Sequence, residues 1–193
     1  MSSSDFVEIC TDVRFVIDLR YASANNFVGR DMYGPFRRAF LHRLAAEKLF
    51  RAAEFLRQTA PGHRFLIYDA LRPRSIQWVL WEHVRDTANQ MYIANPDVGS
   101  LHNFGFAVDL TVVDPGGREL DMGAGYDDFR PVAQPRLEAE HLSSGVLSVH
   151  HINHRLILRT VMTEAGFTQL PHEWWHYDAL PKEDVRRRFQ IVE

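Results

Sequence analysis

Apolar residues recur at helical spacing in two long stretches of the 193-residue chain. In residues 41–56 they lie three or four positions apart, and Pro61-Gly62 follows. The second stretch, residues 149–164, stops just before Gly166. This spacing predicts an amphipathic helix over each stretch. A further helix is expected over residues 73–84, because its leading proline is tolerated in a first helical turn.

Short apolar runs rich in β-branched and aromatic residues indicate strands. The expected strands cover residues 15–21, 64–68, 106–113 and 167–177. A short final helix is expected to begin near Pro181. Helices and strands do not alternate regularly, so we predict an α+β fold, with an antiparallel sheet and helices packed on one side. No repeat or linker divides residues 1–193, and we expect a single domain.

Composition and charge exclude several classes of partner. The net charge of -3, without a long block of like charges, argues against nucleic acid. No apolar run approaches the roughly 20 residues of a membrane span, and the first residues lack the features of a secretory signal. We expect a cytoplasmic protein, or a periplasmic one if the sequence has been trimmed. The sequence carries no signal for an oligomeric state.

The segment from Ser100 to Asp109 contains the first candidate metal ligands. His102 lies in a predicted turn, whereas Asp109 lies within an apolar strand. A carboxylate in such a strand is costly to bury unless it is paired, hydrogen-bonded or bound to a metal. The alternative is a structural aspartate that caps a loop, with His102 as a surface residue. Cys10 is the only cysteine, so His and carboxylate side chains must supply most ligands of any metal.

The second candidate segment, residues 170–177, interleaves three aromatic residues with one glutamate and two histidines. It matches His-Glu-x-x-His, a motif that binds zinc only on a helix. The aromatic residues favour a strand, so we interpret that match as accidental, with His172 as a bystander. A core strand with hydrogen-bonded polar groups is the alternative. On a regular strand Glu173 and His176 would face opposite sides, so a bulge or strong twist is required.

Together the two segments supply three protein ligands, His102, Asp109 and His176, as a catalytic zinc site requires. Zinc bound there would lower the pKa of a water molecule toward neutrality. Glu173 could accept the proton of that water. Arg72 follows a predicted strand and precedes a helix, where its guanidinium could stabilise an oxyanion. Its alternative role is a surface ion pair at the start of the helix.

The pattern Ser-x-His-x-x-Gly-x-Ala-x-Asp, followed by Glu-Trp-Trp-His, resembles the zinc D-alanyl-D-alanine dipeptidases. That family includes the vancomycin-resistance dipeptidases. Its fold is shared with peptidoglycan D,D- and L,D-carboxypeptidases and with the hedgehog N-terminal domain. The likeness covers most of the chain. It also includes four further segments, which are residues 18–22, 26–29, 69–73 and 122–127.

The resemblance implies one Zn²⁺ per chain, held by His102, Asp109 and His176, and a small cell-wall dipeptide as substrate. It implies Glu173 as the catalytic base and Arg72 as the group that stabilises the oxyanion. The residues implied to contact the dipeptide are Tyr21, Ser100 and Asp127. The acidic Asp127 suits a free substrate ammonium, and Ser100 could donate a hydrogen bond to the polar end of the substrate.

Two other functions stay open at the level of sequence. A carboxypeptidase that trims longer peptidoglycan stems would use the same metal ligands, and a non-catalytic zinc-binding module would need neither Glu173 nor Arg72. A separate histidine group, His150, His151 and His154, has helical spacing between its first and last members. We expect these three to be exposed residues at a helix start, with a second metal site as the alternative.

Overall fold

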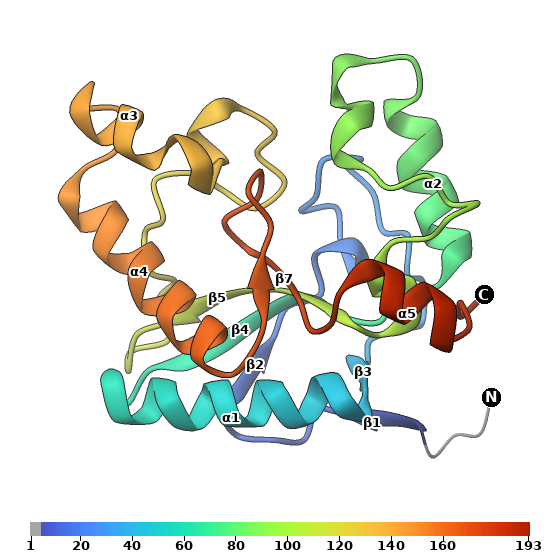
Figure 1. The fold of residues 1–193 in the computed structure, drawn as a ribbon, viewed down its shortest axis with the longest axis horizontal. Coiled ribbons are helices and arrows are strands. Elements are labelled where there is room, and N and C mark those ends of the chain that lie inside the picture. The colour runs from blue at the N-terminus through green and yellow to red at the C-terminus, as the bar shows by residue number, and fades with distance from the viewer. Residues whose placement is uncertain (1–4) are drawn as a thin grey trace.

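The computed structural model describes residues 5–193. At its centre is a five-stranded sheet with the strand order β2-β4-β5-β7-β6 (Figure 1). Its strands are β2 (Phe15–Ile17), β4 (Arg64–Asp69), β5 (Ala107–Val113), β6 (Thr168–Gln169) and β7 (His176–Asp178). A second, two-stranded sheet pairs β1 (Phe6–Glu8) with β3 (Phe40–His42).

The helices vary widely in length. The α-helices are α1 (Arg43–Thr59), α2 (Arg74–Val84), α3 (Glu138–Ser143), α4 (Val149–Glu164) and α5 (Lys182–Arg188). The 3-10 helices are η2 (Arg20–Ala22), η3 (Ala88–Tyr92), η4 (Leu101–Phe104), η5 (Pro131–Ala133) and η6 (Pro135–Leu137). Among residues 5–193, none of these helices combines the length and apolar character needed to cross a bilayer.

The predicted α+β class is confirmed, with one exception to antiparallel pairing. Strand β2 runs parallel to β4, and the other neighbouring strands of the large sheet are antiparallel. Parallel neighbours need a long crossover connection. Here the chain between β2 and β4 includes β3 and α1, which supply that crossover.

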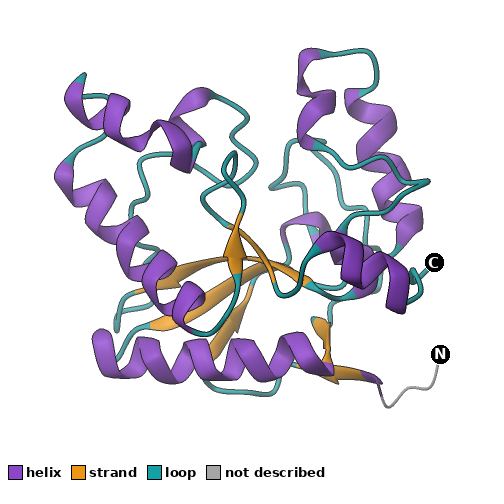
Figure 2. Ribbon diagram, in the orientation of Figure 1, coloured by secondary structure: helices purple, strands orange, loops and turns teal. Residues whose placement is uncertain are grey.

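Helices α1 and α4 pack against each other beside the sheet (Figure 2). The buried side of α1 is made of small and branched apolar residues: Ala45, Ala46, Leu49, Ala52, Ala53 and Leu56. This stripe contacts β4, whose fully buried Ile67 is the register partner of the fully buried Leu110 in β5. Because successive strand residues face opposite sides, the neighbouring residues of β5 are directed away from α1. The polar site lies on that other side.

The predicted helix boundaries are met most closely in α4, which spans Val149–Glu164 as the spacing indicates. The Ser148 side chain accepts a hydrogen bond from the backbone N–H of His151. In return, His151 Nδ1 accepts a hydrogen bond from the backbone N–H of Ser148. This reciprocal capping satisfies backbone donors that a helix start leaves unpaired. A polar residue before the periodic stretch therefore marks the helix start correctly.

The prediction of one strand over residues 167–177 is wrong. The segment forms a hairpin instead, in which β6 and β7 pair and residues 170–175 form the connection. Trp174 and Trp175 are buried in that connection, so their aromatic character reflects burial and not strand geometry. The strand expected over residues 15–21 is also shorter, because η2 begins at Arg20.

Strand pairing places three polar residues in a row across the middle of the sheet. Asp109 of β5 is the register partner of His176 in β7 and of Asp69 in β4. Register partners on neighbouring strands share one face of a sheet. The register between β4 and β5 shifts between Ile67 and Asp69, so an irregularity brings the Asp69 side chain to the same face as Asp109.

Candidate metal centre and active site

Three side-chain atoms converge on one point above this row. The distances are 3.2 Å from His102 Nε2 to Asp109 Oδ1, 2.9 Å from His176 Nδ1 to Asp109 Oδ1, and 3.2 Å between the two imidazole nitrogens. Ligand atoms held about 2.0–2.1 Å from a tetrahedral zinc lie about 3.3 Å from one another. The triangle therefore has nearly the size of three corners of a zinc tetrahedron. All three residues are buried.

Each imidazole is oriented by a partner on its other nitrogen. His102 Nδ1 lies 2.7 Å from the carbonyl oxygen of Ala70, which can only accept, so this nitrogen carries the proton. His176 Nε2 lies 2.8 Å from Asp178 Oδ1 in the same way. When each ring is neutral, the nitrogen that faces Asp109 can therefore offer its lone pair to a metal ion. Partners of this kind fix the ring orientation of metal-binding histidines.

The Asp109 carboxylate sits in a positively polarised environment. Burial alone would raise its pKa, but the neighbouring His102 and His176 outweigh that effect and hold the pKa of Asp109 well below its usual range. Its second oxygen, Oδ2, accepts a hydrogen bond of 3.0 Å from the Tyr126 hydroxyl. The guanidinium of Arg72 approaches the same oxygen at 3.6 Å. Asp109 is therefore ionised, and its Oδ1 lies beside both imidazoles, where it can serve as a ligand of a divalent cation.

Tyr126 therefore acts as an orienting partner of Asp109, and Tyr126→Phe is expected to weaken the affinity of this site for a divalent metal such as zinc by about 10–100-fold. The ring should stay in place, because it packs on Tyr68 and Trp175. Zinc affinity is measured by competition with a chromogenic chelator. The matched control is Tyr68→Phe, whose hydroxyl donates to Glu119 and not to Asp109. Equal losses of affinity in both variants would contradict this role for Tyr126.

Glu173 lies beside the triangle without completing it. Its Oε2 is 3.8 Å from His176 Nδ1, and its side chain is 14% exposed. Burial raises the pKa of Glu173 to about 7, with the charges of His176 and Asp109 acting in opposite directions. A carboxyl with a pKa near neutrality can accept and return a proton at physiological pH. The expected bulge is unnecessary, because Glu173 precedes β7 in the hairpin connection.

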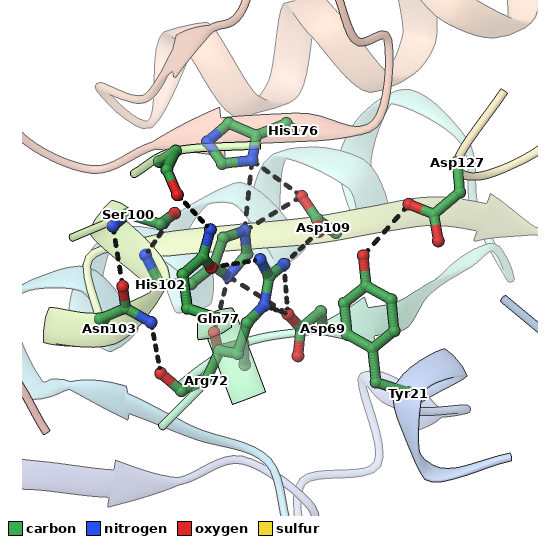
Figure 3. A network of polar contacts seen from close by, with 12 residues as sticks. Tyr21, Asp69, Arg72, Gln77, Ser100, His102, Asn103, Asp109, Asp127 and His176 are labelled. Carbon is green, nitrogen blue, oxygen red and sulfur yellow. Dashed lines mark hydrogen bonds and ion pairs between the residues drawn. The ribbon is translucent and has the colours of Figure 1, made fainter. Parts of the chain in front are cut away.

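Arg72 does not form the surface ion pair that is its alternative role. It is buried, with Nε donating to Asp69 Oδ2 at 2.7 Å and Nη1 donating to Gln77 Oε1 at 2.9 Å. Its guanidinium also lies over the Tyr21 ring, 4.8 Å from the centroid. A guanidinium has five N–H donors, so donors remain for a further acceptor. Figure 3 shows the contacts that join the Arg72 guanidinium to Asp69, Asp109 and Gln77.

One pocket of about 220 Å³ collects all eight site residues that the sequence indicated. They are Tyr21, Arg72, Ser100, His102, Asp109, Asp127, Glu173 and His176. Pockets for drug-sized ligands usually measure about 300–1,000 Å³, so this one suits a smaller molecule. In Figure 3, Ser100 and Asp127 lie on opposite sides of the triangle.

The Asp127 end of the pocket has an unusual carboxyl group. Asp127 adopts a left-handed backbone conformation with φ of 58°. Its Oδ1 accepts from the Tyr21 hydroxyl at 3.2 Å, whereas the buried Oδ2 has no partner among the described residues. Burial, followed by the charge of Asp109, raises the pKa of Asp127 well above its usual range. A cation placed beside this carboxyl would restore its ionised form.

A family model described as D-Ala-D-Ala dipeptidase matches residues 2–193 of the chain. The chain belongs to this family. It is 36% identical over 162 residues to the D-alanyl-D-alanine dipeptidase of Escherichia coli, covering 84% of this chain and 77% of that protein. It is 29% identical over 189 residues to the enzyme of the same name from Enterococcus faecium, covering 88% and 87% of the two chains.

This member of the D-Ala-D-Ala dipeptidase family also uses residues that sequence reasoning did not single out. Asp178 orients His176, Gln77 holds Arg72, and Tyr126 holds Asp109. A signal existed for Asp178, because a residue two positions after His176 on a strand shares its face. No comparable spacing connects Tyr126 to Asp109 or Gln77 to Arg72.

Among residues 5–193, the second histidine group does not bring three ligand atoms as close together as the triangle described above. His150 is exposed at the start of α4, as expected, while His151 and His154 are partly buried. His151 Nε2 lies 3.3 Å from Asp121 Oδ2, and His154 Nδ1 lies 2.8 Å from the carbonyl oxygen of the same residue. These contacts tie the helix start to the loop that leads to Asp127.

Proposed function

We propose that this chain is a zinc-dependent dipeptidase that hydrolyses D-alanyl-D-alanine to two molecules of D-alanine. The observation that carries the proposal is the triangle of His102 Nε2, Asp109 Oδ1 and His176 Nδ1, with the Glu173 carboxyl beside it. Membership of the D-Ala-D-Ala dipeptidase family supports the substrate class. We also propose that residues 1–193 act as one catalytic domain, placed in the cytoplasm.

Zinc is proposed over other metals because two imidazoles and one carboxylate, in a tetrahedral arrangement with one open position, are typical of catalytic zinc sites. The size of the triangle fits that metal without rearrangement. When bound, zinc would supply a Lewis acid that polarises a carbonyl and acidifies a water molecule. The protein's own side chains perform the remaining steps.

In the proposed mechanism Glu173 moves the proton. Its carboxylate accepts a proton from the attacking water at Oε2, and the resulting oxygen nucleophile adds to the carbonyl carbon of the dipeptide. The same carboxyl then gives that proton to the leaving nitrogen, so the bond between carbon and nitrogen breaks and the second D-alanine leaves as an amine. Burial raises the pKa of this carboxyl, which favours both transfers.

Arg72 is proposed to stabilise the negative charge that develops on the carbonyl oxygen. Its guanidinium is held rigidly by Asp69 and Gln77, so little reorganisation is needed when that charge forms. Tyr21 and Asp127 are proposed to hold the substrate ammonium, since the buried Asp127 Oδ2 has an unused acceptor. Ser100 is proposed to contact the substrate at the other end of the pocket.

A metal and substrate screen tests this function. Removal of metal with a chelator is expected to abolish hydrolysis of D-Ala-D-Ala, and one equivalent of zinc per chain is expected to restore it. Among free, N-acetylated and N-terminally extended D-Ala-D-Ala, the free dipeptide should be cleaved with the highest kcat/KM. Equal cleavage of the extended peptide would establish a carboxypeptidase instead. Zinc binding without hydrolysis of any D-amino-acid peptide would establish a non-catalytic module.

A further inference from the structure

We propose that Lys182 and Arg186 of α5 form the subsite that recognises the free carboxylate of the dipeptide. This inference rests on the proposed function and names the specificity element at the end of the pocket that Ser100 occupies. It assigns a role to a helix that none of the chemistry described so far has used.

Helix α5 lies beside the Ser100 end of the pocket. It packs against η4, which begins at Leu101 and carries His102. One guanidinium nitrogen of Arg186 donates to the carbonyl oxygen of Gly99 at 3.0 Å, next to Ser100 in the chain. This contact places the Arg186 charge beside Ser100, and Figure 3 shows Ser100 on the opposite side of the metal triangle from Asp127.

Both basic residues line the pocket, and their spacing explains why. Positions 182 and 186 are four residues apart, so both side chains project from the same face of α5. The intervening acidic residues Glu183 and Asp184 do not line the pocket. The helix therefore presents a face with two positive charges to the cavity.

These two charges are available to a ligand and have no role so far. The Arg72 guanidinium, in contrast, pairs with the buried Asp69 and is proposed to act at the carbonyl oxygen. Arg186 forms no ion pair with a carboxylate within residues 5–193, and its bond to Gly99 uses one of five N–H donors. Lys182 is 45% exposed and lies 4.0 Å from Asp178, whose other oxygen is bound to His176.

A free dipeptide has a positive ammonium at one end and a negative carboxylate at the other, which matches the acidic Asp127 end and the basic α5 end of the pocket. With the ammonium at Asp127 and the scissile carbonyl at the metal triangle, the terminal carboxylate lies one residue further along, and consecutive Cα atoms are about 3.8 Å apart. That direction leads to Ser100 and α5. A carboxylate there can accept from the Ser100 hydroxyl and from a guanidinium, a charge-assisted pairing stronger than a neutral hydrogen bond.

The test compares D-Ala-D-Ala with its C-terminal amide, which lacks only the negative charge. With zinc-bound enzyme, the double variant Lys182→Gln/Arg186→Gln is expected to raise KM for the free acid about tenfold. Both kcat and the KM for the amide should stay within about twofold of wild type, because neither side chain acts on the reacting atoms. The matched control is Arg187→Gln on the same helix. Arg187 pairs with Asp184 and does not line the pocket, so its KM should be unchanged.

Two outcomes would overturn the subsite. Equal increases of KM for acid and amide would mean that Arg186 merely braces the backbone at Gly99. Unchanged values for both would mean that α5 does not contact the substrate. Dissociation constants of the acid and the amide, measured by calorimetry on zinc-bound Glu173→Gln protein with and without the α5 changes, give the same comparison without turnover. If wild type hydrolyses neither compound, the proposed function fails, and these dissociation constants still decide the carboxylate subsite.

Discussion

Replacement of Glu173 by glutamine is expected to leave one zinc per chain and to lower kcat for D-Ala-D-Ala by roughly 10²–10⁴. The amide keeps the size and part of the hydrogen bonding of the carboxyl but cannot accept the water proton. Glu173 Oε2 is 3.8 Å from His176 Nδ1, beside the three ligand atoms and outside their triangle, so its removal should not release the metal. Steady-state kinetics and metal analysis of the purified variant measure the two effects separately.

The matched control is Glu140→Gln, an exposed carboxylate on α3 that lines no pocket described above. It should leave both kcat and zinc content at wild-type values. Loss of zinc in Glu173→Gln would show that this carboxyl is a ligand and not the base. A kcat close to wild type would show that another group moves the proton.

Arg72→Ala is expected to lower kcat by roughly 10²–10³, the usual effect of losing a donor to a developing oxyanion. The structure adds a second expectation, because Asp69 would be left buried without its counter-charge. Breaking a buried ion pair on one side costs about 3–5 kcal/mol of folding stability. Urea unfolding of the variant should therefore show a lower midpoint alongside the kinetic defect.

Two further variants separate the kinetic role of Arg72 from its structural one. Arg72→Lys keeps the charge but not the planar fork, so stability should recover more than kcat does. Arg85→Ala removes an exposed arginine directly after the end of α2 that pairs with Glu82, and it should change stability by less than about 0.5 kcal/mol. If Arg72→Lys restores rate and stability in parallel, the rate loss in Arg72→Ala reflects structural damage.

Local sequence signals are sufficient to predict a structural feature when one physical cause determines that feature. Helix α4 matches its predicted range because Ser148 supplies a cap before the periodic residues and Gly166 follows their end. Asp109 was informative because a carboxylate in a wholly apolar strand needs a partner, and that strand is buried throughout. The two histidines proposed with it, His102 and His176, lie beside this carboxylate in the structure.

Tertiary relationships explain what the sequence did not indicate. Trp174 and Trp175 favour a strand on local propensity, but packing around Tyr126 places them in the β6–β7 connection. The hydrogen bond from Tyr126 to Asp109 joins a loop to a strand 17 positions away, with no periodicity that relates them. The irregularity in β4 before Asp69 depends on its pairing with β5, which one strand alone cannot reveal.

The row formed by Asp69, Asp109 and His176 lies in the sheet, so changes in the surrounding loops and changes in the sheet have different consequences for this fold. These three side chains are spaced by backbone hydrogen bonds between neighbouring strands, so replacements in the surrounding loops leave their spacing intact. Both ends of the pocket are built by segments outside the sheet, including the loop that carries Asp127 and the short helix α5. Descendants of such a scaffold can acquire new peptide preferences by altering those outer segments while the hydrolytic chemistry is inherited unchanged.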